Sequence, residues 1–178
     1  MSGWRWTAVA MLVGTLGLLA WVYPDLPDPM GTQFTFDGTP VRWTPRPQFI
    51  VAFGLVAALI NLLFLGGIPE VLRRTGATRF NVPNRDYWLA TPERRTEALR
   101  RMCPFLARSA VFANTLLLLC LHLVAQWNGA RVLVRIPAAL TGPLLLGTAG
   151  GGVFVLIVWA FHDFAVPAPP LGVERAAR

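Results

Sequence analysis

Four long apolar runs dominate the chain and constrain its fold more than any other feature. They cover residues 6–23, 49–68, 105–127 and 138–161. Each is close to the ~20 residues that an α-helix needs to cross the hydrocarbon core of a bilayer. A helix inside a soluble protein rarely stays apolar around its whole circumference for this length. The sequence therefore predicts an all-α membrane protein with four transmembrane helices.

The first run also has the charged start and apolar core of a signal peptide. The segment "LLAWVYPDLP" has no small-x-small cleavage site, however, and the run is long for the core of a signal. We therefore expect an uncleaved first helix. Residues 1–164 then form a single four-helix membrane domain. The proline-rich tail over 165–178 is expected to be disordered.

The basic residues are distributed unevenly between the loops. The chain has 16 basic residues, all of them arginine, and eight lie in the loop over 69–104. The loop over 24–48 holds two, and the short third loop holds Arg131 and Arg135. Because basic residues concentrate in cytoplasmic loops, the 69–104 loop, both termini and the tail are predicted to be cytoplasmic. The net charge of +7 is then a signal of topology, and we expect no direct binding of nucleic acid.

The extracytoplasmic loop over 24–48 carries a β-hairpin signal. Asp37-Gly38 is a favoured two-residue type I′ turn. Closing the chain on this turn pairs Phe36 with Thr39, Phe34 with Val41, and Gln33 with Arg42. Side chains alternate along a strand, so one face of the hairpin collects Phe34, Phe36, Val41 and Trp43.

An isolated hairpin is marginally stable in water, so this apolar face should rest on helix ends or lipid headgroups. Two interpretations of the hairpin remain open. It is either a simple connector with a tight turn or an extracytoplasmic recognition element. The candidate recognition residues are Gln33, Phe34, Phe36, Gly38 and Trp43.

The cytoplasmic loop contains an unusually polar stretch, "NVPNRDYWLATPERR" over 81–95. Thr91 suits a helix N-cap and Pro92 the first helical position, which predicts a helix from Pro92. The buried stripe of this helix would hold Leu99, Met102 and Leu106.

The residues before that helix read as a turn at Asn84-Arg85-Asp86, followed by an amphipathic anchor, Tyr87-Trp88-Leu89, at the membrane surface. This stretch either docks the bundle to lipid headgroups or forms a surface for a cytoplasmic partner. The candidate docking residues are Asn84, Arg85, Asp86, Tyr87 and Trp88.

The first helix followed by "YPDLPDPMGTQFTFDGTP" resembles the bacterial membrane-protein family of domain of unknown function 1648, and the 81–95 stretch resembles a loop of its longer members. The family includes the immunity protein SdpI, which acts against a sporulation-delaying toxin. The resemblance implies a bacterial plasma membrane, an extracellular peptide toxin and a cytoplasmic regulator as partners. Many members have a histidine where this chain has Gln33, so a proton- or metal-linked role of that residue is not carried over.

Polar residues inside the predicted spans are Asn61, Asn114 and His122. Such residues either hydrogen-bond between helices or line a small cavity or path. Gly147 and Gly151 stand at GxxxG spacing, which favours close helix packing within the chain or between two copies. His162-Asp163 is interpreted as an interfacial pair, on the opposite side of the membrane from His122.

No motif predicts catalysis, a cofactor or a metal ion, so we expect a protein that is not an enzyme. Cys103 and Cys120 lie on one predicted helix, roughly 25 Å apart, which is too far for a disulfide. The favoured function is a sensor or immunity protein for membrane-active peptides. A small transporter or channel-like subunit is the alternative. The sequence does not assign an oligomeric state.

Overall fold

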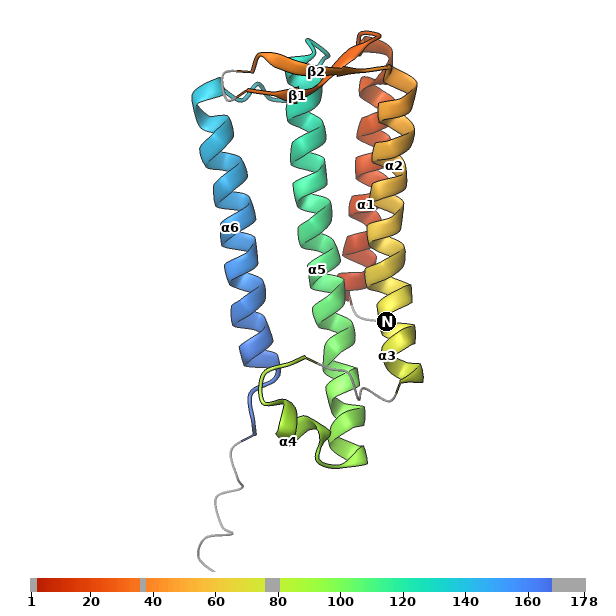
Figure 1. The fold of residues 1–178 in the computed structure, drawn as a ribbon, viewed down its shortest axis with the longest axis vertical. Helices are drawn as coiled ribbons and strands as arrows, with labels where there is room; N and C mark the ends of the chain where they lie inside the picture. The colour runs from red at the N-terminus through yellow and green to blue at the C-terminus, as the bar shows by residue number, and fades with distance from the viewer. Residues whose placement is uncertain (1–2, 36–37, 76–80, 168–178) are drawn as a thin grey trace, which may run out of the picture.

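The computed structural model describes residues 3–35, 38–75 and 81–167. Long helices stand side by side, and a two-stranded hairpin lies across one end of them (Figure 1). In chain order the elements are α1 (Gly3–Val22), η1 (Tyr23–Asp25), β1 (Met30–Phe34), β2 (Pro40–Thr44), α2 (Arg46–Leu62), η2 (Leu63–Gly67), α3 (Ile68–Arg74), α4 (Arg85–Leu89), α5 (Pro92–Trp127) and α6 (Ala138–Asp163).

Four helices within the described residues are long and apolar enough to cross a membrane: Gly3–Asp25, Arg46–Arg74, Pro92–Trp127 and Ala138–Asp163. The predicted fold of four spanning helices with a small hairpin is therefore confirmed. We call the two ends of the bundle the hairpin end, where β1 and β2 lie, and the arginine-rich end, where α4 lies (Figure 1).

The helix α5 is the longest element because its capped start and its apolar run form one helix. Thr91 is the N-cap, and its hydroxyl accepts a hydrogen bond from the backbone N–H of Arg94 at 3.4 Å. The helix has 36 residues and is therefore about 54 Å long, well beyond the ~30 Å of a hydrocarbon core. Its first turns must extend past the membrane at the arginine-rich end.

The second span also runs further than the sequence indicates, because the π-helical turn η2 joins α2 to α3 without a break. Pro69 has no N–H to donate to the carbonyl of Leu65, four residues earlier. The guanidinium of Arg5 on α1 donates to that carbonyl instead, at 2.9 Å. A side chain from another helix thus satisfies the acceptor that the proline leaves free.

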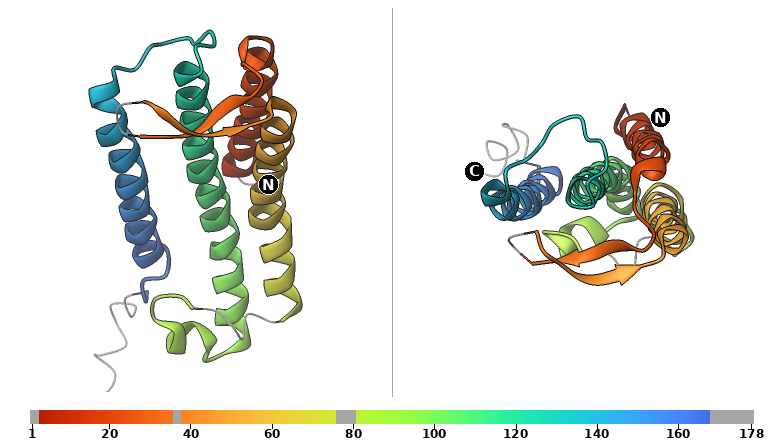
Figure 2. Two further views of the ribbon diagram at one scale, coloured as in Figure 1. Left: turned by 45° about the horizontal axis from the view of Figure 1, so that its top comes forward. Right: turned by 90° about the horizontal axis from the view of Figure 1, so that it is seen from above.

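The central helix is α5, which contacts α1, α2 and α6. Seen along the bundle, α6 lies on the side of α5 away from α1 and α2 (Figure 2). The buried apolar residues form one cluster at each end of the bundle. Large apolar side chains on the outer faces are exposed, as on α6, where Leu146 and Phe154 are 72% and 66% exposed. Such faces are suited to lipid.

The hairpin register corrects part of the prediction. Gln33 pairs with Arg42 as expected, but Phe34 pairs with Pro40. The N–H of Thr35 donates to the carbonyl of Thr39 at 2.9 Å, whereas the prediction pairs Thr39 with Phe36. Gly38 has a positive φ of 86°, and Asp37, the other residue of the predicted turn, lies outside the described residues. The predicted pairing of Phe34 with Val41 is therefore wrong.

The shift in register also divides the predicted apolar face of the hairpin. Phe34 packs on Trp127 at the end of α5, with 4.8 Å between the ring centroids. Val41 and Trp43 do not rest on the bundle, because they are 62% and 55% exposed. Phe36, the fourth residue of that face, lies outside the described residues together with Asp37 and the tail from residue 168.

Candidate functional site

The hairpin is fastened to the residue that follows α5. The Oδ1 of Asn128 accepts from the N–H of Gly31 at 2.7 Å, and its Nδ2 donates to the carbonyl of Gly31 at 2.8 Å. The side-chain amide of Asn128 thus bonds the N–H and the carbonyl of Gly31 as the backbone of a neighbouring strand would. A β-carbon on Gly31 would lie 2.9 Å from the ring of Phe34 and 3.0 Å from Pro40, so only glycine fits this position without a shift.

A second attachment joins the end of α1 to the loop between α5 and α6. The guanidinium of Arg131 bonds both oxygens of Asp25, at 2.5 Å through Nε and 3.1 Å through Nη2. The carboxylate raises the pKa of Arg131 above its usual value. The negative charge of Asp25 therefore offsets the positive charge of one of the two arginines in this short loop.

A cavity of about 470 Å³, which we call the hairpin groove, lies between the hairpin, the end of α5 and the first turns of α6. It is lined by Phe34, Thr35, Trp127, Thr141, Gly142, Leu145 and Leu146. The lining is largely aromatic and aliphatic, with two threonine hydroxyls. Cavities of this size and character are typical of ligand sites.

Of the predicted recognition residues that the structure describes, only Phe34 lines this groove. Gly38 lies against its wall, since a β-carbon there would stand 3.1 Å from Nε1 of Trp127. Gln33 and Trp43 are exposed on the hairpin. The sequence did not reveal the α6 side of the groove, because nothing in the apolar run marks which of its faces meets the hairpin.

Two of the three predicted intramembrane polar residues meet in the middle of the bundle. The amides of Asn61 on α2 and Asn114 on α5 bond each other reciprocally, at 3.0 and 3.1 Å. Each Nδ2 also donates to a carbonyl of its own helix, Ala57 or Ala110, at 2.9 Å. The pair is buried and uses all four of its N–H groups.

His122 lies apart from these asparagines. It lies two turns further along α5, where its Nε2 is 2.7 Å from the carbonyl of Val134 in the loop after α5. Eight residues of helix correspond to about 12 Å, so the three side chains cannot line a single small cavity.

At the arginine-rich end, the polar stretch holds the C-terminus of α6. The indole N–H of Trp88 and the amide of Asn84 donate to the carbonyl of Phe164, at 2.9 and 3.0 Å. The rings of Trp88 and Phe164 pack edge to face, 6.1 Å apart. These donors satisfy a carbonyl that a helix end leaves without an intrahelical partner.

This arrangement corrects two sequence interpretations. Trp88 is 2% exposed, so it is neither a membrane-surface anchor nor part of an exposed docking surface. Asn84 has φ of 56° and precedes the short helix α4, so Arg85 and Asp86 are helical rather than part of a turn. Arg85 and Asp86 are exposed, and Tyr87 is partly buried.

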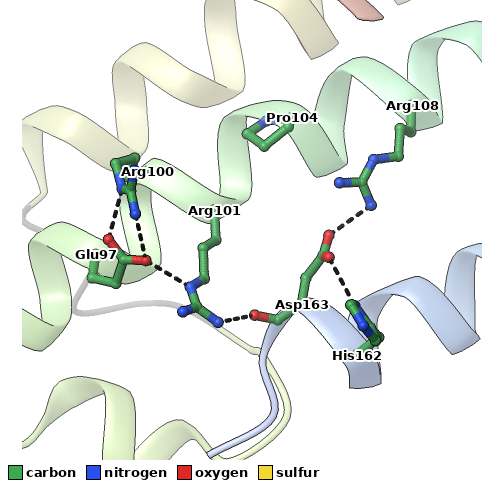
Figure 3. A pocket seen from close by; sticks show the side chains of 7 residues that line it. All are labelled: Glu97, Arg100, Arg101, Pro104, Arg108, His162 and Asp163. Atoms are coloured by element: carbon green, nitrogen blue, oxygen red, sulfur yellow. Dashed lines mark hydrogen bonds and ion pairs between the residues drawn. The ribbon is translucent and has the colours of Figure 1, made fainter. Parts of the chain in front are cut away.

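A second cavity, of about 350 Å³, lies where α5 passes the end of α6; we call it the arginine pocket (Figure 3). It is lined by Glu97, Arg100, Arg101, Pro104, Arg108, His162 and Asp163. Asp163 pairs with Arg108 at 2.7 Å, and both side chains are largely buried, at 16% and 15% exposed. The closer partner of Asp163 is thus Arg108, while His162 is 3.5 Å from it and points outward.

The glycines of α6 contradict one of the two predicted arrangements. Gly147 and Gly151 have open space around the position of an added β-carbon, so within the described residues they do not pack closely against a neighbouring helix. Gly152 makes the close approach, because a β-carbon there would overlap the ring of Phe112 on α5. Packing of Gly147 and Gly151 between two copies stays a prediction.

Cys103 and Cys120 are free thiols on α5. Within the described ranges, no group of three or more histidine, cysteine or acidic residues is placed to hold a metal ion.

Four apolar helices, a hairpin fastened across one end and charged loops at the other define this chain as a multi-pass helical membrane protein. Residues 10–60 match the model of a family described as Domain of unknown function (DUF1648). This segment runs from α1 through the hairpin into α2, and the match supports the resemblance to that family seen in the sequence. No match was found among curated proteins or among solved structures.

Proposed function

We propose that this protein is a non-enzymatic membrane protein of the sensor or immunity type. In this proposal the hairpin groove binds an apolar segment of a membrane-active peptide at the extracytoplasmic face of a bacterial plasma membrane. The groove is the observation that carries the proposal. Its place beside the hairpin fits a peptide that arrives from outside, provided that the eight arginines of the 69–104 loop keep the other end in the cytoplasm.

The chemistry of the groove favours a peptide over a lipid tail as its occupant. A lipid tail needs only an apolar wall. The rings of Phe34 and Trp127 offer large apolar contacts. The hydroxyl of Thr141 donates to the carbonyl of Pro137 at 3.5 Å and keeps lone pairs that can accept an N–H of a peptide backbone. Val41 and Trp43 on the same hairpin do not line the groove, but they are exposed and add apolar surface at this end of the bundle.

A signalling role also needs a route to the cytoplasm, and α5 offers one. Trp127 at one end of this helix lines the hairpin groove, and Arg101 and Arg108 nearer the other end contact α6. A cytoplasmic regulator would meet the exposed Arg85 and Asp86 of α4 beside this end.

The transporter alternative has less support. It relies on Asn61, Asn114 and His122 as a polar path, and the two asparagines use their donors on each other and on their own helices. A conducting role predicts that Asn61→Leu abolishes function. A protective role predicts that this change is tolerated and that blocking the groove is not.

The test measures membrane potential with a voltage-sensitive dye in bacteria challenged with membrane-active peptide toxins. Leu145→Trp fills the hairpin groove with a larger side chain. Leu144→Trp is the matched control, because Leu144 is the adjacent residue of α6, is 39% exposed and does not line the groove. Immunoblots of the membrane fraction establish equal amounts of each variant.

We expect the wild type, Leu144→Trp and Asn61→Leu to preserve the potential and Leu145→Trp to lose most of the protection. Protection by Leu145→Trp equal to the wild type would remove the groove from the proposal. A shift of the potential by expression alone, abolished by Asn61→Leu, would instead favour the transporter.

A further inference from the structure

The arginine pocket contains more hydrogen-bond donors than its own carboxylates use. The Nη1 of Arg108 bonds Asp163, while its Nε and Nη2 have no acceptor within the part of the chain that the structure describes. The Nε of Arg101 bonds Glu97 and its Nη1 bonds the carbonyl of Asp163, which leaves its Nη2 available. These donors line a cavity rather than a packed interface (Figure 3).

The charges of the pocket do not cancel. Three guanidinium groups, from Arg100, Arg101 and Arg108, face two carboxylates, which leaves one positive charge. Both carboxylates are engaged: Glu97 bonds Arg100 and Arg101, and Asp163 bonds Arg108. His162 lies at the rim of the pocket and is 82% exposed.

Aromatic residues beside the pocket indicate its depth in the membrane. The guanidinium of Arg108 stands over the ring of Trp159, 5.0 Å from its centroid, and Trp159 packs on Trp4. Tryptophans concentrate at the interface between hydrocarbon and water. The pocket therefore lies at the level of lipid headgroups.

Exposed apolar residues of α6 continue from the rim of the pocket toward the hydrocarbon core. Val158 and Val155 lie four and seven residues before His162, on the same face of the helix, and are 47% and 42% exposed. A lipid whose headgroup occupies the pocket can lay an acyl chain along these side chains. A soluble anion would gain nothing from them.

We propose that the arginine pocket binds a phosphate group and that an anionic phospholipid of the surrounding bilayer supplies it. Arginine guanidinium groups bind phosphate oxygens through paired, charge-assisted hydrogen bonds. Basic pockets between membrane helices are suited to anionic headgroups. This site lies at the end opposite to the hairpin groove and does not depend on the proposed function of that groove.

The chain contains a matched control for this site. Glu70, Arg73 and Arg74 repeat the spacing and the ion pairs of Glu97, Arg100 and Arg101, but they lie outside the pocket. Arg73→Gln and Arg100→Gln each remove one exposed guanidinium and leave the glutamate with a second arginine. Arg108→Gln removes the central donor of the pocket.

Native mass spectrometry of the detergent-solubilised protein, titrated with phosphatidylglycerol or phosphatidylcholine, measures the binding of each lipid. We expect preferential binding of phosphatidylglycerol and a loss of roughly tenfold in its affinity for Arg100→Gln and Arg108→Gln. Arg73→Gln should bind as the wild type does. Thermal unfolding shows whether Arg108→Gln remains folded, and Arg100→Gln keeps the test valid if it does not.

Equal binding of both lipids, or an equal loss in Arg73→Gln and Arg100→Gln, would overturn the lipid site and indicate diffuse attraction to charge. A second arm adds inorganic phosphate to the protein in phosphatidylcholine nanodiscs and follows thermal unfolding. Stabilisation that Arg100→Gln abolishes, without a preference for phosphatidylglycerol, would keep the phosphate site and assign it to a soluble ligand. Absence of both effects would refute the site.

Discussion

Asn61 and Asn114 show how single side chains determine the packing of two helices. Hydrocarbon offers no water to an unpaired amide, so a buried asparagine needs a partner within the protein. The two amides bond each other and their own helices, and none of their N–H groups remains free. Small buried residues nearby, Ala57 and Ala110, allow the helices to approach this closely.

A double-mutant cycle at this pair provides a prediction at the residue scale. Asn61→Leu or Asn114→Leu alone leaves one buried amide without its partner and should lower the free energy of unfolding by about 1–3 kcal/mol. The double variant removes both amides and should cost less than the sum of the single changes, by about 1 kcal/mol. Unfolding in mixtures of detergent and SDS measures all four proteins. Additive costs would show that the two amides do not support each other.

At the scale of elements, the contact between α5 and α6 depends on a few residues of each helix. In the middle of the helices, Gly152 lies against Phe112. At the arginine-rich end, the side chains of Arg101 and Arg108 bond the backbone and the carboxylate of Asp163. The polar stretch before α5 completes the contact through Trp88 and Phe164.

Glycine substitutions on α6 test this packing. Gly152→Ala should lower the free energy of unfolding by about 1–3 kcal/mol, because its methyl group would overlap the ring of Phe112. Gly147→Ala and Gly151→Ala should change it by less than about 1 kcal/mol, in the stabilising direction, because their surroundings are open and alanine favours the helix. Unfolding curves of the three variants measure these changes in free energy. An equal loss at Gly147 would show that this face of α6 packs against another chain.

For the whole molecule, the orientation in the membrane follows from the loops rather than from the helices. Arginines are concentrated at one end of the bundle. At the other end, Asp25 offsets Arg131. Moving the arginine-rich loop across the membrane would be costly, so we expect the hairpin to be extracytoplasmic and both termini to be cytoplasmic.

Cysteine labelling tests this orientation. In a background that carries Cys103→Ser and Cys120→Ser, Thr39→Cys places a thiol at an exposed position of the hairpin and Thr96→Cys at an exposed position of α5. A membrane-impermeant maleimide added to intact spheroplasts should label Thr39→Cys at once and Thr96→Cys only after permeabilisation. The reverse pattern would invert the topology and move the hairpin groove to the cytoplasm.

The sequence by itself determined those properties that depend on residues close together in the chain. Four apolar runs specify four spanning helices because hydropathy is summed over consecutive residues. Thr91 and Pro92 specify the start of α5 because a cap bonds a backbone group only three residues away. The Gln33–Arg42 pairing was also predictable, although the register of the hairpin shifts on both sides of this pair.

Only the tertiary structure decided which distant residues meet. Asn61 and Asn114 are 53 residues apart in the chain, and Trp88 bonds a carbonyl 76 residues away. The arginine pocket and the hairpin groove each join α6 to segments far from it in sequence, and neither has a motif of its own. An apolar helix has nearly equivalent faces, so its sequence says that it enters the membrane but not which side meets its neighbours. The packing of α5 against α1, α2 and α6 makes that choice, and with it both cavities.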